Sequence, residues 1–176
     1  MSDPGGTTSS EALQALTGFL DDQGIGYRVL SHDPTFTAGD EALAAGVEPA
    51  SMVKTLVLRA RDEFLIAAIP ANRTLDLERA RVAMRASPQL RLATEQEIAD
   101  EFPQFEVGAI PPLGIRVPEV IDIRLLYRER VACAAGDHRH SVLVDPRDIV
   151  GLAEPRVADI CRHDDHAGRF HDVPHV

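Results

Sequence analysis

Hydrophobic residues along this chain recur at two spacings, one typical of helices and one typical of strands. Leucine and phenylalanine at helical spacing predict a helix that begins after Ser10, whose hydroxyl can cap the first turn, and that ends at Gly24. Two runs rich in valine, leucine and isoleucine, at 52–59 and 64–69, flank a charged turn. These runs predict a β-hairpin.

Shorter patterns predict the remaining elements. Thr94 and Glu97 match a capping box, which predicts a helix over 94–102. Residues 103–119 hold four prolines and two glycines, and such a stretch continues neither a helix nor a central strand, so we expect an ordered loop there. The other predicted elements are strands at 27–30, 120–123, 130–135 and 141–144 and helices at 37–45, 76–84 and 146–152.

The order of these elements predicts a single domain of the α/β (α+β) class. Several strands are joined by connections shorter than the roughly dozen residues that a parallel crossover needs, so we expect a mixed, largely antiparallel sheet with surrounding helices. The predicted boundaries are a flexible leader at 1–10, the domain at 11–153 and a flexible, polar, histidine-rich tail at 154–176.

Composition and charge exclude several classes of protein. The 18 basic and 28 acidic residues give a net charge of −10, which argues against a generic DNA or RNA coat, because such proteins bind phosphates through lysine and arginine. An enzyme that contacts only the end of an RNA is compatible with this charge. No apolar run approaches the roughly 20 residues of a membrane span, and no secretory signal begins the chain. Cys133 and Cys161 are too few for a disulfide framework, which favours a cytoplasmic protein.

Lys54 is the first candidate for a functional residue, because it is the single lysine beside 17 arginines and lies within an apolar strand. A charge in such a run costs free energy unless it faces water, a partner or a ligand. It either lines a pocket, where it could hold a phosphate or polarise a carbonyl, or points outward from a half-exposed strand.

A glycine- and proline-rich loop is the second candidate. Its backbone N–H groups could point at one oxyanion, because glycine allows close approach and proline keeps the chain rigid; the alternative is a loop without a ligand. The loop comprises Gly108, Ala109, Ile110, Pro111, Pro112, Leu113 and Gly114.

Histidines provide the remaining candidates. His138, in a turn between two predicted strands, could orient or protonate a substrate near neutral pH, although a plain polar hairpin turn explains it as well. His32 and Thr37, after the first predicted strand, form a weaker candidate of the same kind. The histidine-rich tail invites a metal site, but it lacks the paired ligands of a zinc motif, so we expect neither a metal nor another cofactor.

Taken together, these segments resemble the YbaK/ProX family, stand-alone relatives of the editing domain inserted in bacterial prolyl-tRNA synthetases. The likeness extends from about Leu13 to Leu152 and depends on motifs that follow one another in order. They are the strand with Lys54, the segment Pro70–Leu77, the segment Arg91–Glu95, the loop Gly108–Gly114 and the Ala135-Gly136 turn.

The resemblance implies a compact α/β fold whose mixed sheet curls into a barrel-like core, and hydrolysis of wrongly charged aminoacyl-tRNA in trans. It assigns the family's lysine to Lys54 and its Gly-x-x-x-Pro loop to Gly108–Pro112, and it matches His32, Thr37 and His138 to further motif positions. Pro111 stands where relatives often have serine, which removes a hydroxyl and an N–H donor and leaves the edited amino acid open.

The resulting hypothesis is a deacylase that hydrolyses mischarged aminoacyl-tRNA carrying a small amino acid. Lys54 would anchor the terminal phosphate or the ester oxygen, the Gly108–Pro112 backbone would cradle the carbonyl, and water or the ribose hydroxyl would attack. The expected partners are the acceptor end of a tRNA and an aminoacyl-tRNA synthetase, with no DNA and no membrane. A non-catalytic module that binds aminoacyl-tRNA or a synthetase is the main alternative, and a metal-dependent hydrolase that uses the tail histidines is a further one.

Overall fold

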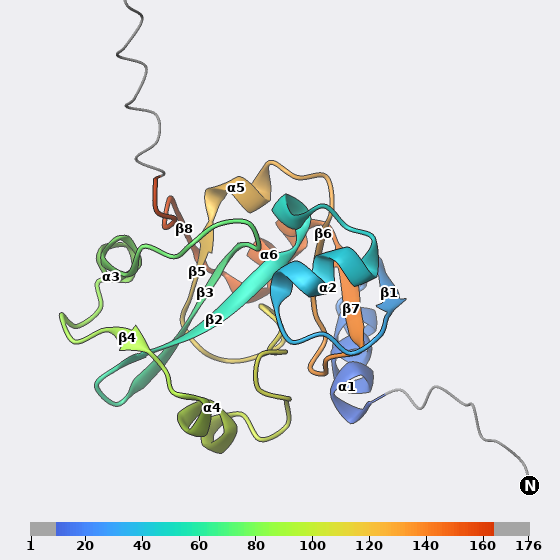
Figure 1. Ribbon diagram of the computed structural model, residues 1–176, viewed down its shortest axis with the longest axis horizontal. Coiled ribbons are helices and arrows are strands. Elements are labelled where there is room, and N and C mark those ends of the chain that lie inside the picture. The colour runs from blue at the N-terminus through green and yellow to red at the C-terminus, as the bar shows by residue number, and fades with distance from the viewer. Residues whose placement is uncertain (1–9, 164–176) are drawn as a thin grey trace, which may run out of the picture.

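The computed structural model describes residues 10–163, whose strands form two sheets (Figure 1). A three-stranded antiparallel sheet has the order β1–β7–β6, and a five-stranded mixed sheet has the order β4–β2–β3–β5–β8. The strands are β1 (Tyr27–Ser31), β2 (Val53–Ala60), β3 (Glu63–Pro70), β4 (Arg91–Leu92), β5 (Glu119–Asp122), β6 (Val131–Ala134), β7 (His140–Val144) and β8 (Arg156–Ala158). The helices are α1 (Glu11–Asp22), α2 (Ala38–Ala45), the 3-10 turn η1 (Pro49–Ser51), α3 (Leu77–Met84), α4 (Glu95–Glu101), α5 (Ile123–Leu126) and α6 (Pro146–Ala153).

The predicted α/β (α+β) class is confirmed, but the two sheets do not close into the expected barrel. Met52, just before β2, forms a single bridge to Ala132 of β6, and β2 then turns away to pair with β4 at Leu58 and Arg59. Between these contacts, the outer edge of β2 has no strand partner within residues 10–163. The sheet also has more parallel pairing than predicted, because β5 is parallel to both β3 and β8.

Local signals in the sequence set the helix boundaries. The Ser10 hydroxyl accepts from the N–H of Leu13, and Thr94 and Glu97 form the complete capping box. Gly46 ends α2 with φ 69°, in the left-handed region that glycine adopts readily. No helix of the described residues has the length and apolarity that a membrane crossing requires.

The side chains of β2 and β3 point alternately to the two faces of the five-stranded sheet. On one face, Val53 and Val57 pack in the clusters that include Leu113 and Ile110 of the glycine–proline segment, and we call it the loop face. On the other face, Leu58 packs in the cluster with α3 and the chain after β8. We call it the Lys54 face, since residues 54 and 58 lie an even number of positions apart on one strand.

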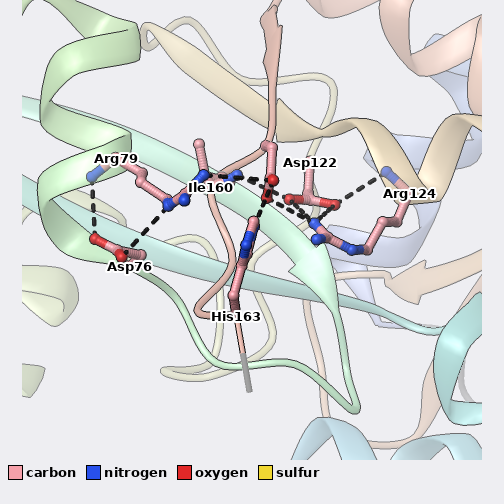
Figure 2. A network of polar contacts seen from close by, with 7 residues as sticks. Asp76, Arg79, Asp122, Arg124, Ile160 and His163 are labelled. Carbon is pink, nitrogen blue, oxygen red and sulfur yellow. Dashed lines mark hydrogen bonds and ion pairs between the residues drawn. The ribbon is translucent and has the colours of Figure 1, made fainter. Parts of the chain in front are cut away.

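The C-terminal segment is more ordered than the tail predicted from residue 154. Residues 156–158 form β8, and Ile160 and Cys161 are completely buried on the Lys54 face. Asp122 accepts from the Ile160 N–H, and Arg124 links Asp122 to Asp159, so the end of β5 holds this segment in place (Figure 2). Residues 1–9 of the predicted leader and 164–176 of the predicted tail lie outside the described residues.

Candidate functional site

The segment Gly108–Gly114 crosses the loop face of the five-stranded sheet. Ile110 packs with Val57 and Ile66, whereas Leu113 packs in the neighbouring cluster with Val53, so the segment bridges two parts of the core. Its residues 109–113 are all buried, including the two prolines. The segment is therefore held rigidly over the sheet, as its composition predicts.

His138 lies against the beginning of this segment. A methyl group built on Gly108, where φ is 88°, would lie 3.4 Å from the His138 ring. The His138 Nε2 donates to the Val107 carbonyl at 2.9 Å, which leaves Nδ1 of the neutral ring as an acceptor. The ring also contacts Phe36, which is 77% exposed, at 5.0 Å between centroids. The structure therefore brings His138, which the sequence offered as a separate candidate, next to the loop.

His32 joins the same region through a hydrogen-bonded chain that the sequence did not reveal. Its Nδ1 donates to the Asp33 carbonyl at 2.8 Å, and its Nε2 lies 3.0 Å from the Ser141 hydroxyl. Ser141, which is fully buried, donates in turn to Glu41 at 2.5 Å. Burial raises the pKa of Glu41, and the Ser141 hydrogen bond opposes that rise. This chain fixes the segment after β1, and helix α2, against β7.

Thr37 has a structural role, as the cap of a helix. Its hydroxyl accepts from the N–H of Asp40 and caps α2, which carries Glu41. Thr37 therefore positions helix α2, whose Glu41 is linked to His32 through Ser141. No hydrogen bond joins Thr37 to the Gly108–Gly114 segment in the described part of the chain.

The structure does not bring Lys54 together with this group. Lys54 lies on the opposite face of the sheet, because its side chain alternates with those of Val53 and Thr55. Its ammonium group donates to the Arg73 carbonyl at 2.8 Å, and half-burial lowers the pKa of Lys54. The sheet therefore separates the Lys54 ammonium from the loop, and these two features do not line the single pocket expected from the sequence.

Two buried polar atoms on the loop face have no hydrogen-bond partner among the described residues. They are Oγ1 of Thr55 and Oε1 of Glu119. Thr55 lies on β2 between Val53 and Val57, and Glu119 pairs with Ile66 across β3, so both belong to the face that the loop covers. Glu119 is only 5% exposed, and this burial raises its pKa to about 8. The sequence analysis missed Glu119, because the strand predicted at 120–123 begins one residue after it, whereas β5 begins at Glu119 itself.

Comparisons with known proteins identify the family of this chain. Residues 32–152 match the model of the family described as the aminoacyl-tRNA editing domain, which is more than half of the chain. The chain belongs to that family. The matched range includes His32, the Gly108–Gly114 segment and His138, the elements that the fold places side by side.

Relatives of this editing domain carry related names. The chain is 28% identical, over 149 residues, to the prolyl-tRNA editing protein ProX of Acetoanaerobium sticklandii, covering 79% of this chain and 88% of that protein. It is 30% identical over 95 residues to a proline–tRNA ligase of Thermosipho melanesiensis; the match covers 53% of this chain but only 16% of the ligase. A crystal structure described as a proposed trans-editing enzyme for prolyl-tRNA synthetase superposes with a TM-score of 0.78 at 28% identity, covering 89% of this chain and 100% of the other.

A basic recess of about 240 Å³ lies at one end of the editing domain, beside the turn that Lys54 holds. Arg73, Arg124 and Arg128 line it together with Tyr127, which is 79% exposed. The carbonyl that Lys54 binds belongs to Arg73, so the lysine and the recess are neighbours. This recess is a second feature that the sequence patterns did not reveal, since Arg73 lies about fifty residues before Arg124 of α5 and Arg128.

The arginine-rich stretch 73–91 is largely neutralised within the editing domain itself. Arg79 pairs with Asp76 and Asp159, Arg81 with Glu78, and Arg91 with Glu97. Because of these ion pairs, the stretch carries less unpaired positive charge than its sequence suggested. Arg73 is the arginine of this stretch that lines the recess. Among residues 10–163, no group of three potential ligands could hold a metal ion; the histidines beyond 163 lie outside the described part.

Proposed function

We propose that the chain is a trans-editing deacylase that hydrolyses mischarged tRNA carrying a small amino acid. The observation that carries this proposal is the family match over residues 32–152, within which the Gly108–Gly114 segment, His138 and His32 are adjacent. The ester that joins an amino acid to the terminal ribose is already activated, so its hydrolysis depends on positioning and on charge stabilisation.

The loop backbone and His138 carry the proposed chemistry. Ala109 already donates to the Glu106 carbonyl and the two prolines have no N–H, so Gly108 and Ile110 supply the remaining donors for the ester carbonyl. The free Nδ1 of His138 accepts a proton from the attacking water or ribose hydroxyl. The rigid, buried prolines limit the space beside the ester, which favours small side chains by sterics.

Lys54 and the basic recess bind the RNA in this proposal. The ammonium group of Lys54 and the arginines of the recess contact phosphates of the acceptor end, and the exposed Tyr127 ring can stack on an unpaired base. Lys54 thus keeps the anchoring role expected from the sequence, on the face of the sheet away from the ester. Since two relatives are named for prolyl-tRNA, the tRNA of proline is the first to test.

The experiment is a deacylation panel with alanyl-, cysteinyl- and seryl-tRNA, each on the tRNA of proline. We expect release of at least one free amino acid, and a loss of about 100-fold in kcat with His138→Ala, as for removal of a general base. His163→Ala is the matched control, because His163 is also hydrogen-bonded through Nε2 but lies beside Asp159, in the network shown in Figure 2. Binding of the tRNA without release of amino acid would instead favour the non-catalytic module.

A further inference from the structure

The unpartnered, buried carboxyl of Glu119 destabilises the folded chain. A buried polar atom without a hydrogen bond destabilises a fold, and a buried charge does so more strongly. Neither Oε1 of Glu119 nor Oγ1 of Thr55 has a partner among the described residues, although other buried polar side chains nearby, such as Ser141 and Asp137, are hydrogen-bonded. A donor would satisfy both atoms at once, because an ionised carboxylate oxygen and a hydroxyl oxygen both accept hydrogen bonds.

We propose that Glu119 and Thr55 bind the α-ammonium group of the amino acid attached to the tRNA, an inference that rests on the proposed function. An ammonium group offers three donors and one positive charge. It therefore satisfies the carboxylate and the hydroxyl together, and it neutralises the charge that burial penalises.

The positions of the two residues suit a group of this size. β3 lies between β2 and β5, whose axes are therefore about 10 Å apart, and Glu119 lies diagonally across this face from Thr55, because Thr55 pairs with Ala68 whereas Glu119 pairs with Ile66. Ala68 pairs with Thr55 across the sheet, and its single methyl group leaves room for the longer glutamate side chain above it. An ammonium group between the two side chains can donate to both oxygens at hydrogen-bond distances of about 2.8 Å.

The surroundings explain how the ammonium group would reach this place from the ester. The loop segment with Ile110 and Leu113 packs over the same face, at the boundary between the two clusters where Thr55 and Glu119 lie. The edge of β2 beside Thr55 has no strand partner within the described chain, and the inference has the ammonium group enter along this edge. The ester would lie against the loop and the amino group against the sheet.

This arrangement gives the site a chemical preference that size alone does not supply. A free amino group is accepted, whereas an acyl group without a cation leaves Glu119 unpaired. The expected substrate class is therefore tRNA esters of free amino acids, and esters with a neutral or blocked α-position are rejected. A site that leaves a buried polar group unpaired discriminates strongly against the ligand that fails to fill it.

The test compares alanyl-tRNA with lactyl-tRNA, in which a hydroxyl replaces the ammonium group and the shape is otherwise kept. We expect the wild-type chain to hydrolyse alanyl-tRNA about 30-fold more efficiently in kcat/KM, as for one charged hydrogen-bonding group. Glu119→Gln and Glu119→Leu should remove most of this preference by lowering only the alanyl rate. Thr55→Val should reduce the preference about fivefold, and Thr55→Ser should keep it.

The outcomes separate the inference from the proposed function. Glu63→Gln, at the exposed start of β3, is the control and should retain the full preference. If wild type hydrolyses alanyl-tRNA and both Glu119 variants keep the preference, the inference is wrong and the deacylase stands. If wild type releases no amino acid from any tRNA of the panel, the proposed function fails and this inference fails with it. A thermal shift by alaninamide but not by lactamide, lost in Glu119→Gln, supports the same assignment without catalysis; an equal shift by both contradicts it.

Discussion

Two buried carboxyl groups on β5, three residues apart, face opposite sides of the sheet and have opposite surroundings. Asp122, on the Lys54 face, is fully buried and accepts from the Ile160 N–H, the Arg124 N–H and the Arg124 guanidinium. Glu119, on the loop face, has an oxygen that accepts from nothing among the described residues. A satisfied buried carboxylate stabilises the fold, whereas an unsatisfied one destabilises it and is tolerated where a ligand completes it.

Asp122→Asn tests the satisfied carboxylate, and we expect the largest loss of stability for this substitution. The amide places donors against the Ile160 N–H and the Arg124 guanidinium, so the free energy of unfolding should fall by about 3 kcal/mol. Urea denaturation measures the change.

Asp145→Asn is the matched control for this substitution. Asp145 also caps a helix, accepts from the N–H two residues on and pairs with that arginine, Arg147, but it lies at the surface. The expected loss there is about 1 kcal/mol or less. Equal losses at Asp122 and Asp145 would mean that burial does not decide the strength of the network.

The charged residues also show which features could be predicted from the sequence. A charge within an apolar strand identified Lys54, but this pattern does not say which face a side chain takes until strand pairing is known. Glu119 was missed because the predicted strand began at residue 120. Helix starts at Ser10 and Thr94 were predictable because capping depends on neighbours in sequence.

Long-range features could not be predicted in this way. The hydrogen bond from Ser141 to Glu41 joins residues 100 positions apart, and no local pattern marks either one. Likewise, β8 is three residues long and lies in a polar stretch, so its pairing with β5 and the burial of Ile160 depend on tertiary contacts. The predicted tail therefore begins too early, and residues 154–163 belong to the fold.

The pH dependence of stability tests the unpartnered carboxyl of Glu119. Burial raises the pKa of Glu119 from its ordinary value of 4.5 to about 8, so the folded chain holds a proton that the unfolded chain releases across that range. Stability should therefore fall as pH rises from about 4.5 to 8. Glu119→Leu removes this ionisation and should gain about 3 kcal/mol on wild type between pH 5.5 and pH 8.5.

Glu97→Gln is the control for that experiment, because the shift at Glu97 has the opposite sign. Hydrogen bonds from Arg91 lower the pKa of Glu97 to about 2, so its stabilising contribution is lost only as pH falls from 4.5 towards 2. The difference between Glu97→Gln and wild type should stay constant from pH 5.5 to 8.5. If Glu119→Leu also shows a constant difference, then Glu119 is not buried as an isolated carboxyl.

The smallest expected effect is that of Lys54→Met, which tests whether the two faces divide binding from chemistry. A cation that contacts only phosphate contributes to RNA affinity, so KM for mischarged tRNA should rise about tenfold and the salt dependence of binding should weaken by about one phosphate contact, while kcat stays unchanged. Lys54→Arg should retain most of the affinity, and Arg28→Met, at an exposed position on β1, should change neither constant. Alternation along β2 directs the Lys54 side chain away from the loop. A fall in kcat with unchanged KM would instead place the Lys54 ammonium at the ester, and the proposed division of binding and chemistry between the two faces would then be wrong.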